Sequence, residues 1–186
     1  MARGKKPLLE NIEIKKIAAE GKSIAYVDEK VLFVPNTVPG DIVDVQVTRK
    51  RKSFLEGFIV NVRKYSDIRT DPFCSHFGIC GGCKWQNLPY QLQTEFKQQE
   101  IIDNLQRIGK VELQNVSPII GSPKTTYYRN KLEYTFCNKR FLTREEIANG
   151  QDIDRTPAVG FHVPGLFDKV IDIEKCYLQA EPSNGV

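Results

Sequence analysis

The chain has 186 residues, of which 40% are hydrophobic and 27% are charged, a composition ordinary for a folded globular protein. No apolar run approaches the roughly 18 residues needed to span a bilayer, and no apolar core of a secretory signal follows the basic residues Arg3, Lys5 and Lys6. We therefore expect a cytoplasmic protein without a membrane partner, folded as one large domain or two small ones.

Positive charge is concentrated in the first part of the sequence. Residues 1–73 carry 14 Lys and Arg against 10 Asp and Glu, whereas residues 74–186 carry 13 of each kind. A basic segment of this kind favours a polyanionic partner such as nucleic acid. The alternative is a solvated basic face that has no partner.

Residues 1–70 have the pattern of short β-strands. Apolar residues alternate with polar ones in several runs, which include Ile12 and Ile14, then Val43, Val45 and Val47, then Phe58, Val60 and Val62. Residues typical of turns, such as Pro39-Gly40-Asp41, separate these runs. About five short strands in one small segment predict a closed, OB-like barrel, an architecture that often binds oligonucleotides.

A cluster of four cations falls where the loop between the fourth and fifth predicted strands should lie. It consists of Arg49, Lys50, Arg51 and Lys52. Cations on an exposed loop tip suit contacts with phosphate groups, so these four residues are candidate RNA contacts. A loop that serves only solubility is the alternative.

Three of the five cysteines fall within ten residues, spaced C-x5-C-G-G-C: Cys74, Cys80 and Cys83. Converging thiolates repel one another unless a cation holds them, and glycines let a loop wrap closely around such a group. Cys137 and Cys176 are the candidates for a fourth ligand. Zinc and an iron-sulfur cluster both accept four thiolates, so the residues alone leave the two open.

Two further segments have a local signature. Residues 89–108 are predicted to form a helix, because Pro89 suits its first turn and Gly109 its end. Its apolar side chains lie on two opposite faces, which is typical of a helix packed between two layers. The polar residues 143–157 look like an insertion, a short helix or a loop, to which we assign no chemistry.

The sequence resembles a known family at several places. Gly21-Lys22-Ser23-Ile24-Ala25, Val31-Leu32-Phe33-Val34-Pro35 and Val38-Pro39-Gly40-Asp41 are similar to a TRAM domain, a small RNA-binding barrel. The run from Cys74 to Gln86 closely resembles the iron-sulfur motif of the RNA 5-methyluridine methyltransferases, most of all those that act on 23S ribosomal RNA, with transfer RNA as the other substrate class.

The resemblance implies a ligand set and two more RNA contacts. In that family a fourth, later cysteine completes a [4Fe-4S] cluster, and the run of Gly160-Phe161, Ile171-Asp172-Ile173 and Cys176 matches its surroundings. The implied ligands are therefore Cys74, Cys80, Cys83 and Cys176, and Cys137 is interpreted as a small core residue. A tyrosine-arginine run similar to the family's makes Arg129 and Lys131 candidate RNA contacts, although a structural ion pair of Arg129 is an equal alternative.

The expected fold is α+β: an OB-like TRAM barrel over residues 1–70, followed by a mixed α+β cluster-binding domain over residues 71–186. The family's catalytic, Rossmann-like domain, which binds S-adenosylmethionine, is expected to be absent, because no glycine-rich loop follows a strand. We therefore predict no catalytic residue in this chain, no methylation by it alone, and no DNA partner. The alternative is a zinc-stapled RNA-binding module without methyltransferase activity.

Overall fold

The computed structural model describes residues 6–150 and 156–185. The chain separates into two compact units, each described here by itself. The first unit comprises Met1–Asp71 and Trp85–Gly121, and the second comprises Pro72–Lys84 and Ser122–Val186. The division at residue 70 expected from the sequence remains a prediction. No helix among the described residues has both the length and the apolarity to cross a lipid bilayer.

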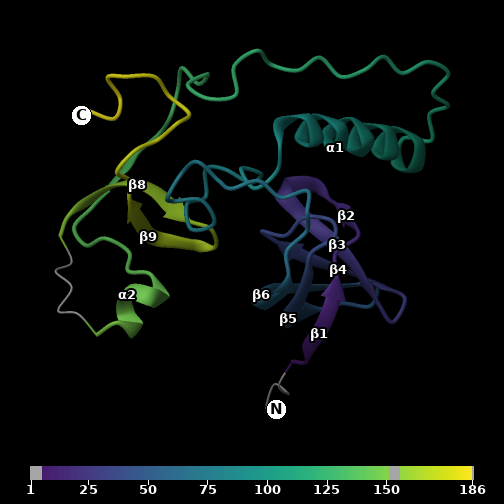
Figure 1. Ribbon diagram of the computed structural model, residues 1–186, viewed down its shortest axis with the longest axis horizontal. Helices are drawn as coiled ribbons and strands as arrows, with labels where there is room; N and C mark the ends of the chain where they lie inside the picture. The colour runs from purple at the N-terminus through teal and green to yellow at the C-terminus, as the bar shows by residue number, and fades with distance from the viewer. Residues whose placement is uncertain (1–5, 151–155, 186) are drawn as a thin grey trace. The chain divides into compact units, whose positions relative to one another are not determined.

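The first unit contains one curled, six-stranded sheet (Figure 1). Its strands lie in the order β1-β5-β6-β4-β3-β2, all antiparallel except the pair β4 and β6. This order is that of a small Greek-key barrel and is consistent with the OB-like barrel expected from the sequence. The bounds are β1 (Leu8–Glu13), β2 (Lys16–Ile17), β3 (Lys22–Val27), β4 (Lys30–Pro35), β5 (Ile42–Lys50) and β6 (Phe54–Lys64), with a 3-10 turn η1 (Ala19–Gly21) before β3.

The two edges of this sheet are consecutive parts of the same chain segment. β1 pairs with β5, and β2, only two residues further along, pairs with β3. Between them the amide of Ile14 donates to the carbonyl of Asp41 at 2.8 Å and the amide of Lys15 donates to Ile24 at 2.8 Å. The N-terminal segment therefore bridges the sheet edges, which would otherwise expose unpaired backbone groups.

The barrel core follows from the strand alternation. Val43, Val45 and Val47 on β5 are almost fully buried, as are Leu32 and Val34 on β4. Each residue between these core positions points to the opposite face of the sheet. The alternating valines recognised in the sequence therefore mark the core side of β5, as predicted.

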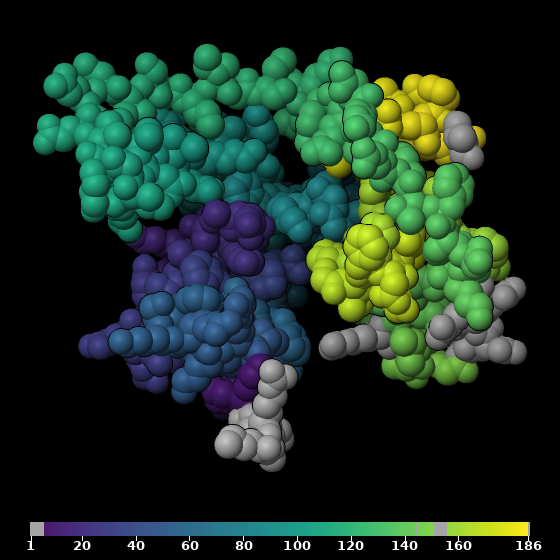
Figure 2. All heavy atoms as spheres, turned by 180° about the vertical axis from the view of Figure 1, so that it is seen from behind, coloured from purple at the N-terminus to yellow at the C-terminus, as the bar shows by residue number. Residues whose placement is uncertain are grey.

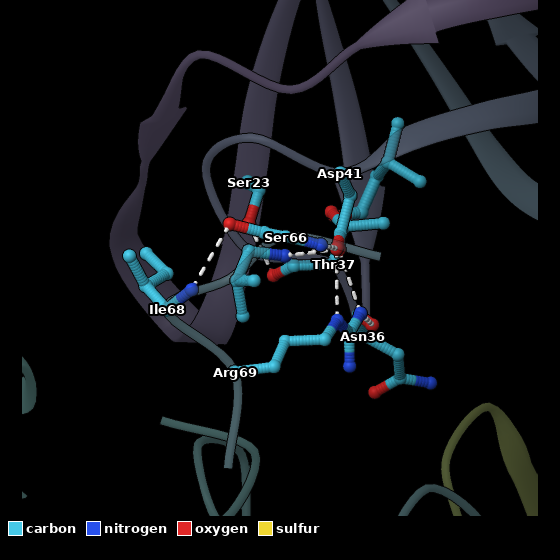
Figure 3. A network of polar contacts seen from close by, with 9 residues as sticks. Ser23, Asn36, Thr37, Asp41, Ser66, Ile68 and Arg69 are labelled. Carbon is cyan, nitrogen blue, oxygen red and sulfur yellow. Dashed lines mark hydrogen bonds and ion pairs between the residues drawn. The ribbon is translucent and has the colours of Figure 1, made fainter. Parts of the chain in front are cut away.

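A buried carboxylate joins separate segments of the barrel (Figure 3). Asp41 is fully buried, and its two oxygens accept hydrogen bonds from the amides of Val38 at 2.8 Å and Ser66 at 3.0 Å. The guanidinium of Arg69 donates to both oxygens, at 2.8 and 2.6 Å, and also to the carbonyl of Asn36 at 3.2 Å. Because a buried charge is costly unless paired, this network fixes the turn before β5 to the segment after β6.

The predicted helix is confirmed, with a change of winding near its end. α1 (Tyr90–Asp103) follows Pro89, and the π-helical turn η2 (Asn104–Ile108) continues it up to Gly109. Ile101 and Ile108 are 59% and 79% exposed, so one of the two apolar stripes is not covered by the described part of this chain. Figure 2 shows this part of the chain, in teal, at the surface.

The second unit contains a three-stranded antiparallel sheet in the order β7-β8-β9. A hairpin around Pro164 and Gly165 joins β8 (Ala158–Val163) to β9 (Leu166–Asp172). On its other side β8 pairs with the short strand β7 (Thr135–Cys137). Before it, Arg129 makes an isolated parallel bridge to Gln179.

The polar segment 143–157 begins with a short helix, α2 (Arg144–Ala148). Thr143 and Glu146 form a reciprocal capping box at its start. Residues 151–155 of the predicted insertion lie outside the described residues. The described chain is mostly β with few helices, which agrees with an OB-like barrel and leaves the expected cluster-binding domain as a proposal.

Replacing Arg69 by leucine should destabilise the barrel strongly, because it leaves the carboxylate of Asp41 buried without its cation. We expect the free energy of opening the barrel to fall by about 3–5 kcal/mol. Hydrogen exchange at the amides of Val43, Val45 and Val47 in the full chain measures this free energy. Arg49→Leu is the matched control, because Arg49 is exposed and lies 3.5 Å from Glu56, which is only partly buried. This substitution should change the free energy by less than about 1 kcal/mol. Equal effects of the two substitutions would contradict the role given to Asp41.

Candidate metal centre and nucleic-acid interface

The cysteine loop of the second unit is shaped by local turns. The amide of Phe77 donates to the carbonyl of Cys74 at 3.1 Å, and the amide of Cys80 donates to the carbonyl of His76 at 2.9 Å. Gly78, between them, has φ +88°, a conformation that side-chain-bearing residues rarely adopt. These turns fold the five residues between the first two cysteines into a compact loop.

The two adjacent glycines differ in the room that they leave for a side chain: Gly81 leaves none, whereas a Cβ atom on Gly82 would make an ordinary contact. A Cβ atom on Gly81 would lie 2.9 Å from the carbonyl oxygen of His162, and one on Gly82 would lie 3.4 Å from the sulfur of Cys80. The amide of Gly82 instead donates to that sulfur at 3.3 Å. The two glycines therefore bring the loop backbone against β8 on one side and against a thiol on the other.

Cys176 lies after β9 and is the most buried of the five cysteines, at 7% exposure. Asn184 holds its backbone from both sides: the side-chain oxygen accepts from the Cys176 amide at 2.7 Å, and the side-chain nitrogen donates to the Cys176 carbonyl at 3.2 Å. The position of this thiol is therefore fixed by a residue eight places further along the chain.

The four predicted ligands lie in one neighbourhood. Burial raises the pKa of the Cys80 thiol, the amide of Gly82 partly offsets this effect, and the nearby thiols of Cys83, Cys74 and Cys176 raise it further. Ionising Cys80 beside three other thiols is unfavourable, and a bound cation would reverse that balance. Four thiols are the donor chemistry that a thiolate-bound zinc ion or iron-sulfur cluster requires.

Across residues 6–150 and 156–185, no group of three or more His, Cys, Asp or Glu side chains is arranged to hold a metal ion. The four cysteines are therefore gathered without forming a ready-made metal site. Cys137, interpreted as a core residue, is only half-buried at the end of β7, and its thiol donates to the carbonyl of Lys139 at 3.4 Å.

Two contacts hold the loop to the segment around Cys176. The Nε2 atom of His76 accepts a hydrogen bond from the amide of Glu174 at 3.1 Å. The ring of Phe73 packs edge-on against Tyr177, with 5.1 Å between ring centres. His76 lies within the cysteine loop and Phe73 directly precedes it, and both of their partners lie within two residues of Cys176. Together the two contacts hold the Cys176 segment against the loop.

Tyr134 is a further residue of this site that sequence reasoning missed. Its hydroxyl is buried without a well-formed hydrogen bond. Burial raises the pKa of this hydroxyl, and the neighbouring Cys176 thiol adds to the effect. The ring is held by Phe161, 4.8 Å away between centres. Tyr134 thus places a potential O–H donor beside one of the four sulfurs.

The candidate RNA contacts are distributed over both units. Arg49, Lys50, Arg51 and Lys52 are all exposed at the tip formed by β5 and β6, as predicted for a hairpin loop. In the second unit Arg129 and Lys131 are also exposed; the Arg129 amide donates to Leu178, and Lys131 pairs with Glu133 at 2.8 Å. The clustered cations of the barrel form the stronger local concentration of positive charge.

The barrel of the first unit matches a known domain family. Residues 10–60, which span most of its strands, match the family model described as the TRAM domain. The first unit carries a TRAM domain. The resemblance seen in the glycine- and proline-containing runs of the barrel is thereby confirmed.

The relatives of this TRAM-containing chain have RNA methyltransferase names. An "Uncharacterized RNA methyltransferase" of Bacteroides thetaiotaomicron is 55% identical over 170 residues, which cover 91% of this chain and 37% of the relative. A "23S rRNA (uracil(1939)-C(5))-methyltransferase RlmD" of Francisella tularensis subsp. novicida is 36% identical over 169 residues, covering 87% of this chain and 37% of the relative. The chain thus spans little more than a third of the length of these curated relatives.

A solved structure shares the fold. It is the Pyrococcus abyssi tRNA (uracil-54, C5)-methyltransferase in complex with S-adenosyl-L-homocysteine, with a TM-score of 0.54 and 23% identity. The match covers 95% of this chain and 34% of that protein. The resemblance to RNA uracil methyltransferases predicted from the cysteine motif and the barrel is confirmed by these comparisons.

Replacing His76 by alanine should loosen the segment that precedes Cys176, because the Glu174 amide loses its acceptor. A lost hydrogen bond of this kind is worth about 1 kcal/mol, so exchange of the Glu174 amide should accelerate about fivefold. Amide hydrogen exchange measured by NMR reports this rate, with Ser75→Ala, an exposed neighbour in the same loop, as the control. An unchanged rate at Glu174 in the His76 variant would show that the contact does not hold this segment.

Proposed function

We propose that this chain is the RNA-binding and cluster-binding portion of an S-adenosylmethionine-dependent RNA (uracil-5-)methyltransferase that acts in the cytoplasm. The observation that carries the proposal is the 55% identity over 91% of the chain to a relative named as an RNA methyltransferase. The TRAM domain and the exposed cations from Arg49 to Lys52 support RNA as the partner.

The proposed substrate is 23S ribosomal RNA, with transfer RNA as the second candidate. The name of the Francisella relative supports the former, and the Pyrococcus protein, which resembles this chain in fold, is a tRNA methyltransferase. Neither unit is assigned a catalytic residue. We propose that methyl transfer and S-adenosylmethionine binding belong to the part of the relatives' length that this chain does not span.

The second part of the proposal concerns a [4Fe-4S] cluster held by Cys74, Cys80, Cys83 and Cys176. Support comes from the spacing of the first three cysteines and from the influence of the other three thiols on Cys80. When bound, the cluster would supply a covalent cross-link between the loop and the segment after β9. The chain contributes the adjacent glycines of the loop, the contacts of His76 and Phe73, and the clamp of Asn184 on Cys176.

A cross-link at this place has a physical purpose. Among the described residues of the second unit, few apolar side chains are buried: Ala158, Val170, Ile171 and Leu178, together with the thiol of Cys176. A small core gives little stability by itself, and metal binding adds its free energy to folding when the unfolded chain has no preformed site. We therefore propose that the cluster is a structural staple.

The metal content of the full chain purified without oxygen tests the cluster. We expect about four irons and four sulfides per chain, together with a broad visible absorption. Cys176→Ala should abolish them, and Cys137→Ala, which changes a half-buried cysteine outside the set, should retain them. One tightly bound zinc without sulfide would contradict the cluster and support a zinc-stapled RNA-binding module instead.

Deleting the gene that encodes these residues should remove one 5-methyluridine from 23S ribosomal RNA, as measured by mass spectrometry of RNA fragments. The intact gene should restore the modification. Expression of residues 1–186 alone should not restore it, because we place methyl transfer outside them. Restoration by residues 1–186 would contradict that assignment, and loss of 5-methyluridine from transfer RNA only would identify the second substrate class.

A further inference from the structure

The outer face of the barrel carries aromatic side chains that the core does not require. On β3, Ser23 and Ala25 are fully buried, whereas Tyr26 is 57% exposed. On β4, Leu32 and Val34 are fully buried and Phe33, between them, is only partly buried. Alternation therefore places Tyr26 and Phe33 on the side of the sheet opposite to the core.

Strand register brings a third aromatic residue to the same side. Tyr26 on β3 pairs with Val31 on β4, and Val31 pairs with Phe54 on β6, so these three residues form one row across the sheet. Phe33 lies two residues along β4 from Val31 and contacts Phe54 edge-on, with 5.9 Å between ring centres. We call Tyr26, Phe33 and Phe54 the outer aromatic face.

Positive charge borders the outer aromatic face at β6. The guanidinium of Arg49 lies 5.9 Å from the centre of the Phe54 ring. The amide of Arg51 donates to the Phe54 carbonyl at 2.9 Å, so the cationic loop begins directly beside this ring. Lys50 pairs with Leu55 in the strand register, and its side chain is exposed.

Acidic groups near the face limit where an anion can lie. Glu56, next to Phe33 in the register, is paired with Arg49 at 3.5 Å and with Lys22 at 3.9 Å. Asp28 and Glu29 are carried by the turn between β3 and β4, next to Tyr26. Phosphate groups are therefore favoured at the β5–β6 loop and disfavoured at the β3–β4 turn.

We propose that the outer aromatic face is a stacking platform for single-stranded RNA. Bases would lie across Phe54, Phe33 and Tyr26, while the phosphates that precede or follow them contact the loop of Arg49 to Lys52. Aromatic side chains beside a cationic loop are the combination that binds unpaired nucleotides, because every base has a flat face to stack and every nucleotide carries a phosphate. The inference rests on the proposed RNA-binding function and adds to it the face and the mode of contact.

Binding of a fluorescent single-stranded oligoribonucleotide to the full chain tests the platform by anisotropy. Tyr26→Ser and Phe54→Leu each remove a ring, and the leucine keeps apolar packing at the less exposed position. We expect each substitution to raise Kd about tenfold, because the loss of one stacked base costs that order of affinity. The slope of log Kd against log salt concentration should not change.

Substituting Lys50 and Lys52 by alanine should reduce that slope, because fewer cations then contact phosphate groups. Phe136→Ser, an 82% exposed aromatic residue of the second unit, is the control and should bind as the unaltered chain does.

The outcomes separate this inference from the function on which it rests. Unchanged amide exchange in β5 will show that both aromatic variants keep the fold. If these variants then bind RNA as well as the unaltered chain does, the proposed stacking platform is wrong, and the proposed RNA binding still stands. If duplex RNA binds more tightly than single strands, stacking is also wrong. If no RNA binds, both proposals fail. If the variants instead abolish self-association of the chain, the face joins two copies and is not a platform for RNA.

Discussion

The buried pair of Asp41 and Arg69 is the constraint on which the barrel depends. A carboxylate without solvent is stable only when charge and hydrogen bonds surround it, and Asp41 obtains these from Val38, Ser66 and Arg69, which lie on both sides of the two longest strands. The backbone carbonyl of the same residue accepts from Ile14 in the bridging N-terminal segment. One residue thus ties together the start, the middle and the end of the barrel.

The inner and outer faces of this barrel have separate tasks. The inner face is filled by aliphatic side chains such as Val45 and Leu32, which are fully buried. That complete core leaves the outer side chains of β3, β4 and β6 free to differ in chemistry without loss of the fold. The aromatic and cationic residues found there are therefore better explained by a partner than by packing.

The second unit relies on a different principle. Its sheet has three strands, and contacts of His76 and Phe73 join the loop of Cys74 to Cys83 to the segment after β9. Four thiols gathered in a unit with so small a core suit a bound group that adds stability which apolar burial does not supply. A barrel held by the Asp41–Arg69 ion pair and a unit cross-linked by thiolates would give the proposed RNA-binding chain two rigid parts.

The sequence by itself determined the local features of this protein. The alternating valines located β5 and showed which of its faces belongs to the core, and Pro89 and Gly109 marked the ends of the helix. The spacing of three cysteines located the thiol-rich loop. Each of these signals lies within a short stretch of the sequence. Only the tertiary structure decided which distant groups meet. It brings the Cys176 thiol close enough to influence Cys80, buries Asp41 against Arg69, and aligns Tyr26 with Phe54 across β4. These contacts depend on strand register and burial, which join residues far apart in the chain and have no period in the sequence.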